Sequence, residues 1–195
     1  MARRSLTLAA LAALTLPLTA AAAPAAPGAV GGIEFMLGFP GNIETETDLG
    51  TFEGDLSTSL GLVPWVEKKL GESVGFGAEM MFVWIKGDSD DAERRLVMSP
   101  HLRLRMSFPI IDKVTFDGFI AAGGTIWTAE DNASGGFADT RFGWSLRFGF
   151  GGSYAINEVV SAFAHLGWYT STTYGDDITA SIDTVPLCLG LRGNF

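Results

Sequence analysis

Apolar and polar residues alternate along most of the chain with a period of two. The stretch RFGWSLRFGFGGSY, residues 141–154, shows this most clearly: one parity is mostly bulky and apolar, and the other holds only Arg, Gly and Ser. Successive side chains of a β-strand point to opposite faces, so the pattern predicts strands with one apolar and one small or polar face. We predict an all-β fold of eight strands, at 32–39, 55–66, 73–86, 96–108, 114–128, 140–154, 159–173 and 182–195.

The connections between these strands alternate in length. The long ones are 40–54, 87–95, 129–139 and 174–181, and the short ones are 67–72, 109–113 and 155–158. Transmembrane barrels of outer membranes have short periplasmic turns and longer outer loops, whereas a soluble barrel has no reason to sort its loops by end. The first strand is short for a membrane crossing, and its extension into the following loop is the alternative.

The two ends of the chain carry features of export. Basic residues at the N-terminus precede an apolar run from Leu6 to Leu18 and an Ala-x-Ala site at Ala20 and Ala22. This order predicts a secretory signal peptide, residues 1–22, followed by one domain, residues 23–195. An N-terminal membrane anchor is the alternative, although the apolar run is short for a span. At the other end, the last predicted strand runs to Phe195 on its apolar face.

The composition narrows the class of protein. The chain has 13 basic and 22 acidic side chains, a net charge of −9, so we expect no nucleic-acid partner, which would need clustered Lys and Arg. Beyond the signal peptide, no stretch has the roughly 18–20 apolar residues of a transmembrane helix. Cys188 is the only cysteine, which excludes an intramolecular disulfide. Two classes remain: a soluble β-protein or a transmembrane β-barrel.

The residue types on the two faces favour an eight-stranded antiparallel up-and-down transmembrane β-barrel. A soluble barrel has Lys and Glu outside and apolar side chains inside, whereas Gly, Ser and Arg fit the narrow interior of an eight-stranded membrane barrel. The bulky face then meets lipid. Aromatic bands are expected near both ends, with Phe108, Tyr154 and Phe195 at the short turns and Trp84, Phe142 and Trp168 at the long loops.

Three prolines, Pro64, Pro100 and Pro186, fall inside the predicted strands. A closed barrel has no free edge at which a residue without an N–H is tolerated. Each proline is therefore expected to mark a bulge or a misplaced strand boundary.

With its signal peptide, eight alternating strands, the stretch GFGGSYAINE at 149–158 and the final Phe195, the chain resembles the small outer-membrane β-barrels typified by the OmpA transmembrane domain and OmpX. The resemblance implies a place in the cell outer membrane, and it makes Phe195 part of the signal read by the barrel-assembly machinery. Outer-membrane lipid and lipopolysaccharide are the expected partners, and we expect a monomer. Acidic outer loops could share divalent ions with lipopolysaccharide phosphates, although loop solubility explains the same charges.

Candidate chemistry is sparse. His101 and His165, the only histidines, lie on the inward parity without the Cys, His or carboxylate spacing of a metal site, so we expect them to fill the interior. No Ser-His-Asp set can be assembled from one rim. The acidic segment 87–95 lacks the ligand spacing of a calcium loop and is expected to be solvated. We therefore expect no catalytic residue, no metal and no cofactor.

Inward charges on neighbouring strands can pair inside the barrel. Strand pairing across 109–113 and 87–95, together with closure of the first strand on the last, predicts three pairs: Arg105 directly opposite Asp117, Glu79 directly opposite Arg103, and Glu34 with Arg192. Charges in a low-dielectric interior must be paired. With Arg141 and Arg147 also inward, we predict a plugged polar lumen with weak or no conductance.

Three functions fit these features. The first is a non-enzymatic barrel that serves envelope structure or surface interaction. The second is a narrow channel for ions or small apolar solutes. The third and most distant is a soluble secreted ligand-binding barrel. A fold alone does not decide between biological roles.

Overall fold

The computed structural model describes residues 28–86, 94–131, 136–175 and 178–195. The predicted signal peptide, residues 1–22, and most of the acidic segment 87–95 lie outside these ranges. The described residues form eleven β-strands: β1 Ala29–Gly38, β2 Gly41–Thr47, β3 Gly50–Leu56, β4 Ser59–Lys69, β5 Val74–Lys86, β6 Arg94–Ile111, β7 Val114–Asp131, β8 Gly136–Ala155, β9 Val160–Tyr174, β10 Ile178–Thr184 and β11 Pro186–Asn194.

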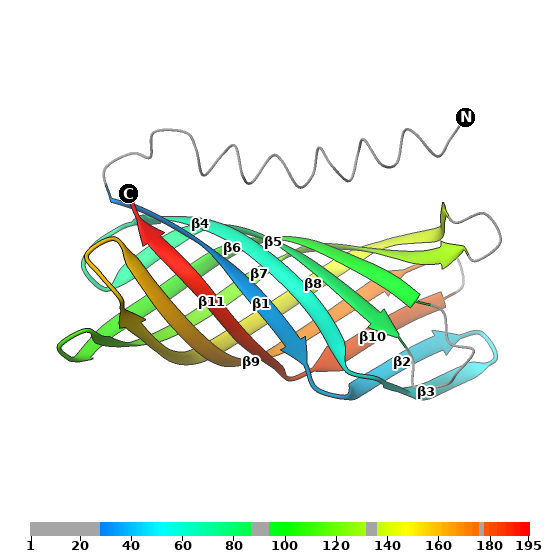
Figure 1. Ribbon diagram of the computed structural model, residues 1–195. Coiled ribbons are helices and arrows are strands. Elements are labelled where there is room, and N and C mark those ends of the chain that lie inside the picture. Colours follow the sequence, from blue (N-terminus) through cyan, green and yellow to red (C-terminus); the bar gives the residue numbers. More distant parts are fainter. Residues whose placement is uncertain (1–27, 87–93, 132–135, 176–177) are drawn as a thin grey trace.

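The strands form one closed antiparallel barrel (Figure 1). β1 and β2, β3 and β4, and β10 and β11 continue one another, so the wall has eight strands, as predicted. The barrel closes where β1 pairs with β11, from Val30 opposite Asn194 to Gly38 opposite Pro186. Closure leaves the described wall without a free strand edge, which is the condition for a β-structure to cross a membrane.

The two ends of the barrel differ. At one end, here called the short-turn end, lie the start of β1, the end of β11 and the connections 70–73, 112–113 and 156–159 (Figure 1). At the opposite end, here called the hairpin end, the β2–β3 and β7–β8 hairpins extend the wall. The three connections predicted as short therefore share one end of the barrel. Two of those predicted as long, 40–54 and 129–139, lie at the other end and are largely strand.

The prediction of a loop at 40–54 is wrong, because most of this segment forms the β2–β3 hairpin, whose strand β2 pairs with β10. The alternative, an extension of the first strand, is what the structure has. The turn 109–113 is also shorter than predicted: β6 runs to Ile111, and a register shift between Pro109 and Ile111 precedes the reversal. Lys113 completes that turn with a φ of 63°, the left-handed conformation that such turns require.

The prolines behave in two ways. Pro64 and Pro100 lie inside continuous strands whose register is unchanged on either side, so the predicted bulge or boundary error is wrong for both. Each is paired on one side only, with Ile33 and Met80 respectively, and the wall tolerates the local gap. Pro186 does mark a boundary, because the last wall strand breaks between β10 and β11.

Burial alternates along the wall as the sequence pattern predicts. On β6, His101, Arg103 and Arg105 are buried, whereas Leu102 and Leu104 between them are 63% and 39% exposed. Large apolar side chains are exposed on every strand of the wall, including Phe35, Phe76, Phe116, Phe148, Leu166 and Leu189. A continuous exposed apolar surface of this kind is unfavourable in water and favourable in hydrocarbon, so the soluble barrel is excluded. These outward apolar side chains are here called the apolar belt, and they form the lipid face.

Aromatic residues lie toward both edges of this belt. Phe108, Tyr154 and Phe195 lie near the short-turn end, and Trp84 and Phe142 lie toward the other end, as predicted. Trp168 does not: it lies beside the middle of β9, where its ring packs 5.5 Å from that of Phe148. Within the described ranges, no helix is long and apolar enough to cross a bilayer.

Candidate functional site

Charged side chains gather inside the barrel, in the half nearer the short-turn end. They come from seven strands and form what is here called the lumen network: Glu34 (β1), Glu67 (β4), Glu79 (β5), Arg103 and Arg105 (β6), Asp117 (β7), Arg147 (β8) and Arg192 (β11). All but Arg192 are buried. Because the wall is narrow, side chains from opposite strands meet at the axis.

Inward glycines make room for the large side chains of this half. A Cβ atom added to Gly149 would lie 2.7 Å from Cε1 of Phe119, and one added to Gly32 would lie 2.7 Å from Cζ2 of Trp65. Real Cβ atoms do not approach other carbons so closely. These two glycines therefore leave the volume that the Phe119 and Trp65 rings fill.

Two arginines and two glutamates form a closed ring of charges at the centre of the network. Arg103 Nη1 lies 2.5 Å from Glu34 Oε1 and 2.8 Å from Glu79 Oε2. Arg147 donates to Glu34 through Nη2, and its Nη1 lies 3.2 Å from both carboxylate oxygens of Glu79. The four side chains have no exposed surface. Each charge therefore has two opposite neighbours, which offsets its desolvation.

A second chain of ion pairs runs from this ring toward the short-turn end. Arg103 Nε lies 2.9 Å from Glu67 Oε1, although its N–H is not aligned as a hydrogen bond. Arg105 Nε donates to Glu67 at 2.7 Å, and its Nη1 lies 3.4 Å from Asp117. Arg192 Nη1 then binds the other oxygen of Asp117 at 3.0 Å. The network thus spans from the middle of the barrel to the last strand.

The lumen network is balanced in charge. It contains four carboxylates and four guanidinium groups, so its formal charge is zero when the histidines are neutral. The cations also stand over aromatic faces: the Arg103 guanidinium carbon lies 4.1 Å from the ring centre of Phe119, and that of Arg147 lies 4.6 Å from it. Such contacts stabilise desolvated cations.

The half of the lumen nearer the hairpin end has a different filling. Apolar side chains form one buried cluster there: Met36, Leu56, Val63, Met81, Val83, Ile85, Val97, Trp127, Tyr169, Ala180, Ile182 and Cys188. The polar groups among them are hydrogen-bonded, for example Ser99 to Thr125 at 2.9 Å and Trp127 Nε1 to Ser171 at 2.8 Å. The prediction of a polar lumen is therefore wrong for this half, which is an apolar core with bonded hydroxyls.

The predicted ion pairs are only partly as expected. Glu79 does contact Arg103, and Arg105 does contact Asp117, but neither pair is directly opposed. In the register of the wall, Glu79 lies opposite His101, and Asp117 lies opposite Ser107. The Glu34–Arg192 pair is wrong: Glu34 binds Arg103 and Arg147, and Arg192 binds Asp117.

Glu67 was missed by the sequence analysis. The predicted strand ended at residue 66, which put Glu67 in a turn, whereas β4 continues to Lys69. Glu67 is 2% exposed and accepts from Arg105. The alternation itself could have found it, because Val63, Trp65 and Glu67 continue one inward parity.

The structure also assembles a set that the sequence analysis did not find. His101 Nδ1 lies 2.9 Å from Glu79 Oε1, and His101 Nε2 lies 2.7 Å from Ser145 Oγ, which is the order of a Ser-His-acid triad. The set lies in mid-lumen, not at a rim, and Ser145 is only 1% exposed. A catalytic serine must be reached by substrate and water, and this one is enclosed by the wall.

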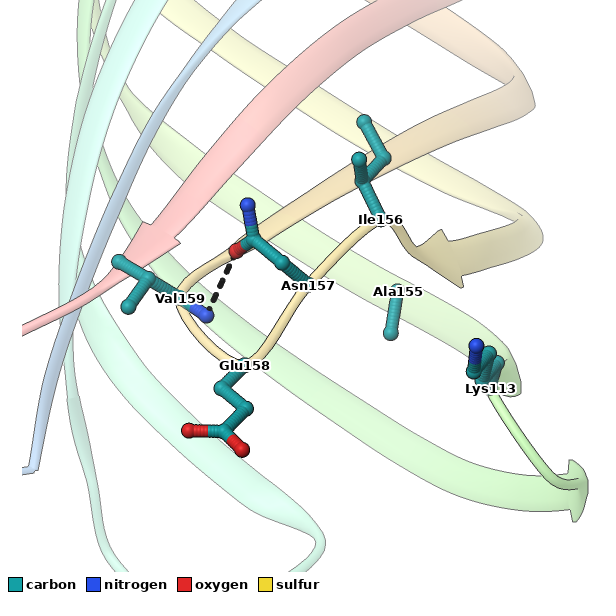
Figure 2. A pocket seen from close by; sticks show the side chains of 6 residues that line it. All are labelled: Lys113, Ala155, Ile156, Asn157, Glu158 and Val159. Atoms are coloured by element: carbon teal, nitrogen blue, oxygen red, sulfur yellow. Dashed lines mark hydrogen bonds between the residues drawn. The ribbon is translucent and has the colours of Figure 1, made fainter.

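An open depression lies at the short-turn end, between the turn 156–159 and the start of β7 (Figure 2). It is lined by Lys113, Ala155, Ile156, Asn157, Glu158 and Val159. The Asn157 side chain caps the turn, since its Oδ1 accepts from the backbone N–H groups of Val159 and Val160 at 2.9 and 2.7 Å. The lining holds no histidine, serine, threonine or cysteine. Among the described residues, no group of three or more His, Cys, Asp or Glu could hold a metal ion.

Comparison with solved structures identifies the fold. Neisserial surface protein A (NspA) superposes with a TM-score of 0.55 at 14% sequence identity, over 86% of this chain and 97% of that one. Two further likenesses are more distant: OprG from Pseudomonas aeruginosa (TM-score 0.46, 13% identity, 86% and 94% covered) and the outer membrane protease OmpT from Escherichia coli (TM-score 0.48, 8% identity, 87% and 97% covered). No family model matches the chain. No curated protein matches it either.

The chain therefore has the fold of the small eight-stranded outer-membrane β-barrels. At 14% identity the likeness to NspA concerns the fold alone. The exposed apolar belt, which does not depend on the comparison, agrees with a barrel that crosses a lipid bilayer.

Proposed function

We propose that the protein is a non-enzymatic outer-membrane barrel with a closed lumen, and that it serves envelope structure or surface interaction. One observation supports the proposal: buried side chains of two different kinds occupy the two halves of the lumen. The lumen network fills the half near the short-turn end, and the apolar cluster around Val63, Val83 and Trp127 fills the other half. Water crossing the barrel would have to displace paired charges and then enter an apolar core.

The absence of catalysis is part of the proposal. The only triad-like set among the described residues has a serine enclosed in mid-lumen, whose Oγ also lies 3.2 Å from the Gly124 carbonyl oxygen. Its acid, Glu79, is already held by Arg103 and Arg147. These contacts support a structural hydrogen-bond role for His101 and Ser145.

A flux measurement distinguishes the closed barrel from the second candidate function, a narrow channel for small solutes. Liposomes containing the refolded wild-type barrel should swell no faster than empty liposomes in isotonic solutions of small sugars or amino acids. A matched control is a variant with both plugs thinned, Trp127→Ala with Arg147→Ala. If the wild type alone admits these solutes, the channel replaces the closed barrel as the proposed function.

The expected partners follow from the same proposal. The belt would contact outer-membrane lipid and lipopolysaccharide, and the barrel would be a monomer, because its wall is closed and offers no pairing edge within the bilayer. Residues 1–22 would direct export and be removed. The barrel-assembly machinery would insert the chain, and Phe195 would form part of the signal that it reads.

Replacing Phe195 tests the assembly proposal. Its backbone N–H donates to the Ala29 carbonyl at 2.9 Å, and its half-exposed ring lies against Gly31 and Gly193 on the lipid face. Phe195→Asp should lower the amount of folded barrel in the membrane several-fold, since a charge replaces the aromatic at the end of the last strand. Phe195→Tyr should keep it near the wild-type level. Quantitative immunoblots of heat-modifiable protein measure both, and an unchanged level for Phe195→Asp would contradict the proposal.

A further inference from the structure

The His165 side chain is a buried group that the lumen network does not use. It is 2% exposed, and neither ring nitrogen has a hydrogen-bond partner. The imidazole stacks on Phe163 with ring centres 4.9 Å apart, and it lies 5.5 Å from Phe119. His101, by contrast, is bonded at both nitrogens. Leaving two buried polar atoms unpaired costs stability, so packing alone is a poor account of a histidine at this position.

Charged and titratable groups face His165 from two paired strands and from across the lumen: Arg147 on β8 and Cys188 and Arg192 on β11, then Asp117 on β7, Arg103 on β6 and Glu34 on β1. Among them, Asp117 is the carboxylate at ion-pair distance, with its Oδ2 4.0 Å from His165 Nε2. That separation is too long for a hydrogen bond. It is short enough for a strong attraction once the ring carries a proton.

Asp117 is already shared between competing partners. Arg192 Nη1 binds its Oδ2 at 3.0 Å, which is the same oxygen that faces His165. Ser107 donates to its other oxygen at 2.5 Å. Arg192 is the most exposed arginine of the network, with 12% of its side chain accessible, and it lies near the end of β11. It is therefore the cation that can turn to water at least cost.

We propose that His165 is a proton-binding site that acts as an acid-sensitive latch on the short-turn end of the lumen. A proton on Nε2 converts the 4.0 Å contact with Asp117 into an ion pair. The balanced network then holds five cations and four carboxylates, and the surplus charge is relieved when Arg192 leaves Asp117 for solvent. Release of Arg192 loosens the last strand at this end. The inference rests on the closed lumen proposed above.

The sign of the pH dependence follows from the surroundings. Burial between two phenyl rings, with Arg103 and Arg147 over Phe119, opposes a charge on His165 in the folded barrel. An unfolded chain takes up the same proton freely. The folded state therefore loses stability as the pH falls through the range in which an ordinary histidine titrates.

The test compares the wild type with His165→Phe, which keeps a ring between Phe163 and Phe119 and removes the proton site. Between about pH 7.5 and pH 5, urea unfolding in lipid vesicles should show a folding constant that falls roughly tenfold further for the wild type than for the variant, which corresponds to one pK unit of linkage. Leu166→Ile, at the outward neighbour of His165, keeps the proton site and should retain the wild-type response. Equal acid responses of wild type and His165→Phe would overturn the latch.

A second measurement does not depend on the folding of a variant. The ring-nitrogen NMR signals of His165 in the wild-type barrel should move to the protonated position on acidification, and the Arg192 side-chain signals should change with the same midpoint. A ring that stays neutral while the barrel unfolds, or an Arg192 that does not respond, overturns the latch. Conductance of the wild type at neutral pH would instead contradict the closed lumen, so the two failures are distinguishable.

Discussion

Replacing Arg103 by methionine is expected to lower the free energy of unfolding by about 3–5 kcal/mol, because it leaves buried carboxylates with an uncompensated charge. Arg103 contacts Glu34, Glu67 and Glu79, and none of these four side chains is exposed. Methionine fills a similar volume, so the effect reports charge more than a cavity. Urea unfolding of the refolded barrel in lipid vesicles, followed by tryptophan fluorescence, measures it.

The matched control restores the charge balance. Adding Glu34→Gln to Arg103→Met returns the lumen network to zero formal charge, so the double variant should lose less than the sum of the two single losses, by about 0.5–3 kcal/mol. Lys69→Ala, at an exposed position of the short-turn end, should change stability by less than about 0.5 kcal/mol. Strict additivity of the two lumen substitutions would show that these side chains do not act as a network.

Leu146→Arg is expected to destabilise the barrel by about 2–4 kcal/mol, because it puts a charge on the lipid face near the bilayer midplane. Leu146 lies between the buried Ser145 and Arg147, within the apolar belt that runs along β8 from Phe142 to Tyr154. The same equilibrium unfolding measurement, made in vesicles of one lipid composition, gives the loss.

The control for Leu146→Arg is the same substitution at a position closer to the edge of the bilayer. Phe108→Arg, on the same outward face but near the short-turn end, should cost only about 0–1 kcal/mol, because an arginine there reaches the interface. The inward neighbour Ser145 is unsuitable as a control, since its hydroxyl is bonded to His101 in a filled lumen. If Phe108→Arg lost more stability than Leu146→Arg, Phe108 would lie deeper in the bilayer than Leu146, which contradicts the assumed position of the membrane.

The fold class and the inward and outward faces could be predicted from the sequence because both depend only on parity. An error in strand length does not change which residues share a face. On residues 141–148, one face holds Phe142, Trp144, Leu146 and Phe148, and the other holds Arg141, Gly143, Ser145 and Arg147. The structure keeps that assignment: Ser145 and Arg147 are buried, and Phe142 and Phe148 are exposed. The pattern therefore identifies a barrel and its lipid face without fixing which residues meet.

The partners inside the lumen could not be predicted, because they depend on where each turn begins. Pairing Phe108 with Val114 would set Arg105 opposite Asp117, but β6 continues to Ile111, so Phe108 lies opposite Phe116 and Arg105 opposite Phe119. A slip of two residues keeps every side chain on its face and changes every partner. A slip of two residues across the loop 87–95 likewise set Glu79 opposite Arg103 in the prediction, whereas it lies opposite His101. Long side chains then reach diagonally, which is why Arg103 and Glu79 still meet.

The apolar half of the lumen was missed for another reason. The run Met80 to Ile85, MMFVWI, is apolar on both parities, and Val83 and Ile85 are buried while Trp84 is 53% exposed. An apolar side chain can face lipid or a dry interior, so polarity alone does not separate the two. Within this run, size could have served as the signal: the inward Met81, Val83 and Ile85 are smaller than the outward Phe82 and Trp84.

The central claim, a lumen closed by two plugs, is tested most directly by single-channel recording of the folded wild-type barrel in planar bilayers at neutral pH. If the lumen network and the apolar cluster close the lumen as proposed, hydrated ions have no continuous path through the barrel. We therefore predict no steady conductance above that of the bare bilayer, at any voltage the membrane withstands. Stable, porin-like openings of the wild-type protein would contradict the account and favour a channel.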